Sequence, residues 1–185
     1  IEIIVKAIEK SGLKPGEEIS ICLDVAANEL KKAKTIEYYE DLVKKFPIKS
    51  IEDPFSEDDW SSWKMINKNI DIQIVGDDLF TTNPRLIKQG LEENWANTLL
   101  LKVNQIGTIS EAVEGAKMMM EKGNHVIVSH RSGETNHAYI VDIAVGIGAK
   151  YLKIGSPCRG ERVAKFNRLL EIEHTILKFN GLLEI

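Results

Sequence analysis

Apolar residues recur along the chain in two alternating patterns, one with helical spacing and one typical of short buried strands. Six short apolar runs predict strands, and the amphipathic segments around them predict helices. The predicted strands cover residues 19–23, 48–51, 72–75, 99–102, 126–128 and 151–154. The predicted helices cover residues 1–11, 35–46, 59–67, 110–122, 137–146 and 162–179, and another begins at a cap formed by residues 82–84.

A polar side chain closes each predicted strand. These residues are Asp24, Glu52, Asp77, Lys102, His130 and Lys153, at intervals of 28, 25, 25, 28 and 23 positions. Strands that alternate with helices at this spacing predict a parallel sheet, and functional groups at the carboxyl ends of its strands are typical of a (β/α) barrel. We therefore expect an α/β fold, a TIM-type (β/α)8 barrel represented here by about six βα units.

A doubly wound open sheet is the alternative fold. Such a sheet usually carries a glycine-rich phosphate turn after its first strand, but residues 24–27 read Asp-Val-Ala-Ala. The barrel is therefore favoured. Because a closed barrel of this type needs eight strands, we expect the first two to lie upstream of Ile1, so that residues 1–185 form one partial domain.

The composition bears on partners and location. Hydrophobic residues make up 43% of the chain, enough for a sizeable core, and 28 acidic residues outnumber 24 basic ones, which does not indicate a nucleic-acid partner. No apolar segment is long enough to cross a bilayer and none resembles a cleavable leader, so we expect a cytoplasmic protein. Cys22 and Cys158 are too few for a disulfide framework, and we expect reduced, buried thiols.

Asp24, Glu52 and Asp77 are the candidate metal ligands. One acidic residue after a strand is more often a helix cap or a surface charge, but three on successive barrel strands converge. Like charges held together are unfavourable unless a cation lies between them, which favours a hard divalent ion bound by oxygen, and Mg²⁺ is the expected ion. The chain has no paired cysteine or histidine spacing that would indicate a soft metal.

Lys102 and Lys153 end apolar strands at the same predicted mouth. Burial lowers the pKa of a lysine, and neighbouring cations lower it further, so a lysine in this position can act as a general base. The alternative interpretation is that both lysines are counter-ions for the carboxylates.

His130 taken alone is more often a structural histidine than a catalytic one. It is followed by Arg131, Ser132 and a glycine, and a loop of this composition after a late barrel strand indicates a phosphate site. Arg159 and Arg162, further along the chain, are interpreted only as charges at the start of the last helix.

Five segments of the chain closely resemble enolases, the phosphopyruvate hydratases of glycolysis. They are SIEDPFSEDDW at 50–60, QIVGDDL at 73–79, LLLKVNQIGT at 99–108, VSHRSGET at 128–135 and KIGSPCRGERVAKFNRLLEIE at 153–173. The resemblance runs through nearly the whole chain. It implies the barrel of the enolase kind, with residues 1–185 as part of the carboxyl-terminal catalytic domain and an amino-terminal domain upstream.

The resemblance also implies roles at the predicted mouth. Asp24, Glu52 and Asp77 hold Mg²⁺, and Lys102 takes the C2 proton when 2-phosphoglycerate is dehydrated to phosphoenolpyruvate. The residues implied to contact substrate are Glu52, Asp77, His130, Arg131, Ser132 and Lys153. Enolases protonate the leaving hydroxyl with a glutamate in a DEGGF-like motif, and no such motif occurs in residues 1–185.

A homo-oligomer, either a dimer or an octamer, is a further implication of the resemblance, as is a cell-surface or secreted pool beside the cytoplasmic one. Two other functions stay open. One is a non-catalytic fragment or binding module. The other is an enzyme of the wider superfamily that acts on another carboxylate, and segment 128–135 argues against it because relatives that bind no phosphate do not need this loop.

Overall fold

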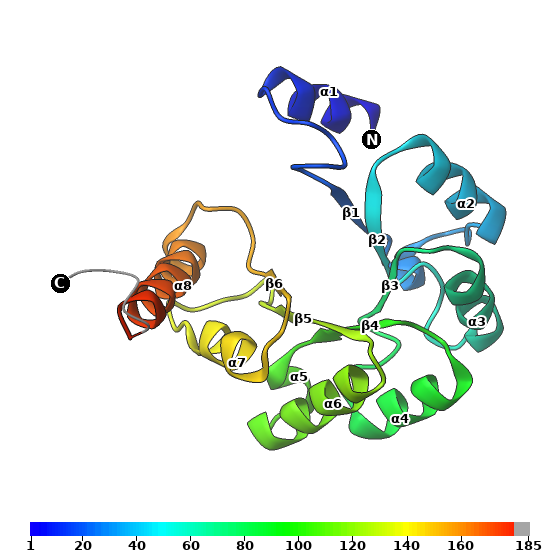
Figure 1. The fold of residues 1–185 in the computed structure, drawn as a ribbon. Coiled ribbons are helices and arrows are strands. Elements are labelled where there is room, and N and C mark those ends of the chain that lie inside the picture. The colour runs from blue at the N-terminus through cyan, green and yellow to red at the C-terminus, as the bar shows by residue number, and fades with distance from the viewer. Residues whose placement is uncertain (180–185) are drawn as a thin grey trace.

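The computed structural model describes residues 1–179 as a curled sheet of six parallel strands with helices around its outer side (Figure 1). The strands are β1 (Ile21–Asp24), β2 (Ile48–Glu52), β3 (Gln73–Gly76), β4 (Thr98–Leu101), β5 (His125–Ser129) and β6 (Tyr151–Lys153), and they pair in chain order. The α-helices are α1 (Glu2–Lys10), α2 (Ile36–Lys45), α3 (Trp60–Asn69), α4 (Pro84–Glu93), α5 (Val103–Ile106), α6 (Ile109–Glu121), α7 (Tyr139–Ile147) and α8 (Gly160–Phe179), and the 3₁₀ helix η1 is Ala27–Glu29. The predicted incomplete barrel of about six βα units is confirmed.

Parallel pairing in chain order places the carboxyl ends of all six strands along one edge of the curled sheet. The register aligns Asp24 with Glu52 at one end of the sheet and Ser129 with Lys153 at the other. Within the described residues, β1 and β6 each pair on one side only, so the sheet is an open arc (Figure 1).

Capping side chains fix where four of the outer helices begin. The caps are Thr35 for α2, Asp59 for α3, Asn83 for α4 and Thr108 for α6, and each accepts a hydrogen bond from a backbone N–H of the first turn. A cap of this kind contributes about 1 kcal/mol, because it satisfies a donor that has no partner within the helix. The predicted cap before Pro84 is confirmed, with Asn83 as the capping residue.

The hydrophobic core lies between the sheet and its helices, and the turn after β3 is packed into it. Phe80 is fully buried, and its ring lies so close to Gly76 and Gly90 that a Cβ at either glycine would collide with it. Because Gly76 directly precedes Asp77, this contact holds the end of β3 at a fixed distance from α4.

Two details differ from the sequence-based expectations. β4 ends at Leu101, so Lys102 follows the strand and directly precedes the short helix α5. Cys22 and Cys158 are both exposed, so the expectation of buried thiols was wrong. Cys22 lines a hollow of about 310 Å³ on the concave face of the sheet. None of the helices within residues 1–179 is long and apolar enough to span a membrane.

Candidate active site

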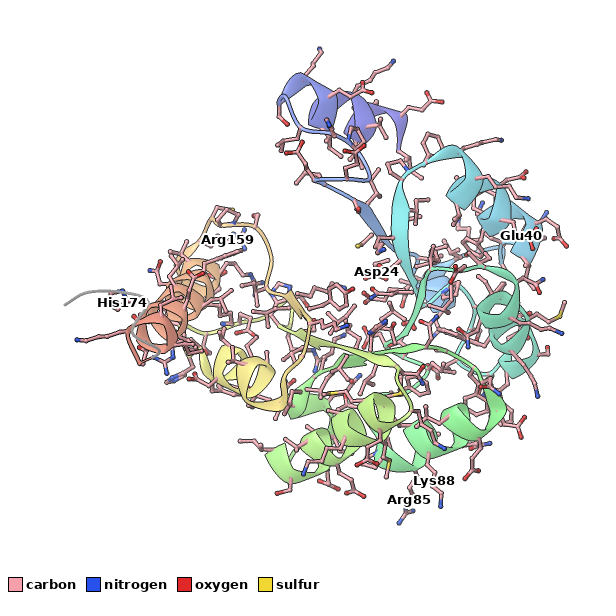
Figure 2. All side chains as sticks on the ribbon, viewed as in Figure 1. Asp24, Glu40, Arg85, Lys88, Arg159 and His174 are labelled. Carbon is pink, nitrogen blue, oxygen red and sulfur yellow. The ribbon has the colours of Figure 1, made fainter. Side chains whose placement is uncertain are left out.

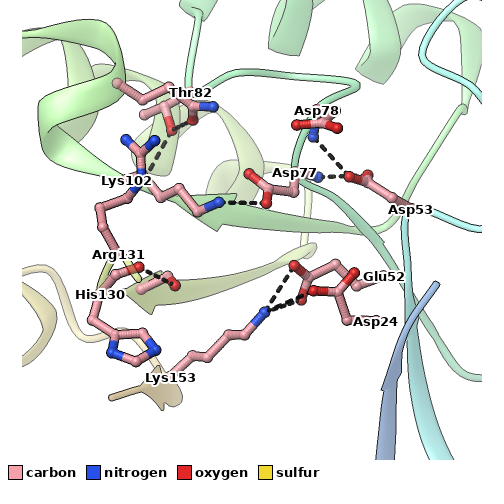
Figure 3. Close-up of polar contacts among 12 residues, drawn as sticks. Asp24, Glu52, Asp53, Asp77, Asp78, Thr82, Lys102, His130, Arg131 and Lys153 are labelled. Atoms are coloured by element: carbon pink, nitrogen blue, oxygen red, sulfur yellow. Dashed lines mark hydrogen bonds and ion pairs between the residues drawn. The ribbon is translucent and has the colours of Figure 1, made fainter. Parts of the chain in front are cut away.

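The carboxyl ends of the strands bring the predicted polar residues to the mouth of the arc. Figure 2 shows Asp24 inside the arc, whereas Glu40 and Lys88 lie on the outer surface with the helices. Two lysines contact carboxylates at this mouth, Lys102 beside β4 and Lys153 at the end of β6 (Figure 3).

The pair between Lys102 and Asp77 is largely shielded from solvent and joins neighbouring strands. The Nζ of Lys102 donates to Oδ2 of Asp77, and the two side chains are 15% and 11% exposed. The backbone N–H of Lys102 donates to Oγ1 of Thr82 at 2.9 Å, and Thr82 is fully buried with a left-handed φ of 56°. Thr82 therefore fixes the backbone from which the Lys102 side chain departs.

Asp53 supports the same pair from β2, a role that sequence reasoning missed. Its carboxylate accepts the backbone N–H groups of Asp77 and Asp78, each at 2.9 Å (Figure 3). Burial raises the pKa of Asp53 to about 7, even though these two hydrogen bonds lower it. Asp53 also has a left-handed φ of 43°, so it turns back toward β3 directly after β2 ends. The available signal was an acidic residue before proline at the end of a strand.

Lys153 forms a second group with Glu52 and Asp24. Its Nζ donates to the two carboxylate oxygens of Glu52 at 2.8 and 2.7 Å and lies 3.5 Å from Asp24. Burial raises the pKa of Glu52, and the hydrogen bond from Lys153 opposes that rise. Burial by itself lowers the pKa of Lys153, but hydrogen bonding to Glu52 and the charge of its carboxylate outweigh burial, so this pKa is raised.

That direction corrects the expectation that the pKa of Lys153 is lowered. The expectation counted the neighbouring lysine and a metal, whereas the carboxylates that face Lys153 determine its pKa in this structure. In both groups of this pair, burial opposes the charged form. The bidentate contact at 2.7 and 2.8 Å nevertheless favours the ion pair between Lys153 and Glu52 over two neutral groups.

The acidic residues at the mouth fit a hard divalent cation. Oδ1 of Asp77 is buried and has no hydrogen-bond partner, which leaves one carboxylate oxygen for a cation. The negative charges of Asp24 and Asp77 both raise the pKa of Glu52, so the three carboxylates lie within electrostatic reach of one another. The assignment of these three residues as the ligand set stays a prediction.

Among residues 1–179, the acidic group whose possible ligand atoms lie within 4.8 Å of one another is Asp53, Asp77 and Asp78. Each Asp53 oxygen already accepts a backbone N–H, so Asp53 holds the turn after β3. Asp78 accepts a hydrogen bond from Asn28 at 3.2 Å, away from the lysine pair. We therefore interpret Asp77 as the candidate metal ligand of this group, and Asp53 as the residue that holds the turn carrying Asp77.

The loop after β5 carries the predicted phosphate-binding residues. The backbone N–H of His130 donates to the Lys153 carbonyl at 2.9 Å, which ties the loop to β6. Nδ1 of His130 is buried without a partner, and burial, reinforced by the charge of Arg162, lowers the pKa of this histidine. Nη1 of Arg131 donates to Oδ1 of Asn104 in α5 at 3.1 Å.

Arg162 was interpreted from sequence only as a charge at the start of the last helix, but the structure gives it a further role. It is only 9% exposed and donates to the carbonyls of Arg131 and Ser132 at 3.0 and 3.1 Å. Lys165, one turn later in α8, is fully buried against Glu134. The sequence offered no signal for either role, because basic residues at the start of a helix are usually exposed.

Comparison with known proteins agrees with this arrangement. Residues 28–181 match the family model described as "Enolase, C-terminal TIM barrel domain". The chain is 48% identical over 193 residues to the enolase of Pyrococcus furiosus, a match covering 95% of this chain and 45% of that relative. It is 47% identical over 194 residues to the enolase of Helicobacter hepaticus, covering 95% of this chain and 46% of the relative.

The extent of these matches decides the family but not the activity of the whole protein. The chain spans about half the length of the curated relatives it matches. The family model, in contrast, covers most of the chain and includes β2 to β6 with the residues at their carboxyl ends. The chain therefore belongs to the enolase family and carries its carboxyl-terminal barrel domain.

Proposed function

We propose that the full-length gene product catalyses the Mg²⁺-dependent, reversible dehydration of 2-phosphoglycerate to phosphoenolpyruvate. The observation that carries this proposal is the arrangement of two lysines among three carboxylates at one mouth, with Lys102 beside Asp77 and Lys153 beside Glu52. Family membership supports the same reaction. A proton alpha to a carboxylate is very weakly acidic, so its removal requires both a positioned base and fixed positive charge.

Lys102 is the base in this mechanism. Its Nζ, as the neutral amine, takes the C2 proton, and the electron pair of the broken C–H bond moves into the substrate carboxylate to give the enolate. In the next step this electron pair forms the double bond between C2 and C3. The C3–O bond breaks, and the hydroxyl leaves as water once a general acid has protonated it. Residues 1–185 lack the DEGGF-like motif whose glutamate supplies this proton in enolases. The shielded position of Lys102 supports its role, because a base works best where water does not compete.

Lys153 and the cation held by the acidic residues would stabilise the negative charge that develops on the substrate carboxylate. Asp24, Glu52 and Asp77 would hold Mg²⁺, and Glu52 and Asp77 would also face the substrate. When bound, the cation would supply positive charge against the developing enolate. Lys153 adds a second fixed cation, held in place by its contacts with Glu52.

The loop after β5 binds the substrate phosphate. Arg131 offers a guanidinium, which suits phosphate recognition, and Ser132 offers a hydroxyl. His130 begins this loop beside Lys153, and its lowered pKa favours a neutral imidazole that can donate a hydrogen bond without adding charge. The expected dimer or octamer and the cytoplasmic location stay predictions, to be tested by sedimentation and cell fractionation.

Lys102→Ala tests the proposal. We expect this variant of the full-length gene product to bind 2-phosphoglycerate but to lose exchange of its C2 proton with solvent by about 10² to 10⁴, because a base acts mainly in the transition state. Proton NMR in deuterated buffer measures the exchange. Lys88→Ala is the matched control, because Lys88 is exposed on α4. Exchange at the parental rate in Lys102→Ala would show that another residue is the base.

A further inference from the structure

Two cationic side chains of α8 are buried beneath the loop that follows β5. Arg162 is 9% exposed and Lys165 is fully buried, and the two lie three positions apart, on one face of the helix. Long charged side chains are rarely buried unless they are fully paired, because an unpaired charge loses its hydration without compensation. The partners of these two residues therefore identify what α8 holds.

Lys165 holds the far end of the loop. Its Nζ lies 2.9 to 3.0 Å from the carbonyls of Thr135, His137 and Glu161, and 2.6 Å from the carboxylate of Glu134. An ammonium group has three N–H donors, so these acceptors engage all of them. Glu134 in turn accepts the backbone N–H of Arg131 at 3.1 Å, which links the buried lysine to the predicted phosphate-binding residues.

Arg162 holds the near end of the loop. Its two terminal nitrogens donate to the consecutive carbonyls of Arg131 and Ser132, at 3.0 and 3.1 Å. A planar guanidinium presents its donors in a fixed fork, so it sets the orientation of both peptide groups at once. Because the peptide unit is planar, a carbonyl directed at Arg162 directs the N–H of the same peptide unit the opposite way.

Gly155 leaves the space through which Arg162 reaches the loop. A Cβ at Gly155 would lie 3.1 Å from Cδ of Arg162 and 3.2 Å from Cε1 of His130, and its φ of +79° also disfavours any side chain. The segment after β6 therefore accommodates Arg162 next to the histidine of the same loop. This contact is independent of the hydrogen bonds that Arg162 makes.

We propose that Arg162 and Lys165 are positioning residues that orient Arg131 and Ser132 for the substrate phosphate. By binding the two carbonyls, Arg162 keeps their negative ends away from an approaching phosphate and leaves the Arg131 side chain and the Ser132 hydroxyl to meet it. Lys165 and Glu134 keep the rest of the loop from shifting. This inference rests on the proposed function, because it assumes that the loop binds the phosphate of 2-phosphoglycerate.

Substitutions of Arg162 in the full-length gene product test the inference. Arg162→Ala is expected to raise both the KM for 2-phosphoglycerate and the inhibition constant of inorganic phosphate about 10-fold to 100-fold, with a smaller change in kcat. Arg162→Lys should show an intermediate effect, because a lysine lacks the fork that holds two carbonyls. Arg168→Ala is the control, since Arg168 is a partly exposed arginine of the same helix that pairs with Asp142 in α7.

The outcomes separate this inference from the proposed function. If Arg162→Ala leaves both constants as unchanged as Arg168→Ala does, the positioning role is overturned while the proposed reaction stands. If the parental protein does not turn over 2-phosphoglycerate, the proposed function fails, and hydrogen exchange of amides 131–135 decides the positioning role. Faster exchange in Arg162→Ala supports it, and unchanged exchange overturns it. If Arg162→Ala does not fold, the same constants and the same amide exchange are measured in Arg162→Lys, and parental values there overturn the positioning role.

Discussion

The two lysine and carboxylate groups at the mouth are held in different ways. Lys102 and Asp77 directly follow β4 and β3, which are adjacent in the sheet, and both side chains are less than one-sixth exposed. Lys153 reaches Glu52 across the arc, from β6 to β2, with 101 positions between them in the chain. It is 39% exposed, and Asp24 beside it is 51% exposed.

The contacts that support the two groups also differ: those of the Lys102 pair are local, and those of the Lys153 group are not. Asp53 accepts hydrogen bonds from the backbone at Asp77 and Thr82 accepts one from the backbone of Lys102, so both partners of this pair are held by contacts close to them. The Lys153 group depends on the curvature of the whole sheet, because its partners lie on strands that do not pair with β6. Lys102 is therefore held by local hydrogen bonds, whereas Lys153 is held by the shape of the sheet.

Asp77→Ala is expected to have the largest effect, because it removes both the partner of Lys102 and a predicted metal ligand. Loss of a residue that only hydrogen-bonds a metal ligand typically lowers activity about 10-fold to 100-fold. Loss of a ligand itself should lower the activity of the full-length gene product by more than that. Mg²⁺ affinity measured by calorimetry with substrate present should fall with it. Asp78→Ala is the neighbouring control and should retain both. Unchanged Mg²⁺ affinity in Asp77→Ala would refute its assignment as a ligand.

Asp53→Ala is expected to weaken the Lys102 side of the mouth selectively. It leaves the N–H groups of Asp77 and Asp78 without their acceptor, and relief of the buried carboxylate offsets part of that loss. We expect the free energy of unfolding to fall by about 2 kcal/mol, measured by urea denaturation. Asp58→Ala, an exposed acid in the following loop, is the control. Equal stability of the two variants would contradict the supporting role of Asp53.

Lys153→Ala breaks the other group and should cost less stability. It leaves Glu52, which is 6% exposed, without its bidentate partner, but water already reaches Lys153 and can replace part of the contact. The free energy of unfolding should fall by about 1 kcal/mol. A double-mutant cycle with Glu52→Gln measures the coupling. A loss larger than that of Asp53→Ala would reverse the proposed ranking of the two sides.

The smallest expected effect is a pH dependence confined to the loop between β5 and α7. Burial raises the pKa of Glu134, but its bonds with Lys165 and the backbone outweigh burial and lower it below 4.5. A lowered carboxyl pKa stabilises the fold above pH 4.5, and this contribution disappears as the pH falls through the folded-state pKa. Glu134→Gln should therefore flatten the pH dependence of unfolding below pH 4.5, by less than about 1 kcal/mol. Equally steep profiles would exclude this contribution.

Much of the fold could be predicted from local patterns because helices and strands leave a signature in neighbouring residues. The interval of 23 to 28 positions between strand-closing residues indicated βα units, and a cap followed by Pro84 indicated the start of α4. The same patterns placed Asp24, Glu52, Asp77, Lys102, His130 and Lys153 at one edge of a sheet. Recognition of the enolase family likewise needed only short segments of sequence.

The contacts that hold the site in place were not accessible in this way, because they join residues that are far apart in sequence. Asp53 and Arg162 bind backbone groups of other elements, and a backbone acceptor or donor is the same whatever residue carries it. Such roles depend on which side chains are buried, and burial is set by the packing of distant elements. This packing leaves Cys22 exposed and buries Lys165. The order of residues along the chain thus specifies the strands and the chemistry at their ends. The curvature of the sheet and the packing of α8 specify which charges meet, because electrostatic contact depends on distance in space and not in sequence.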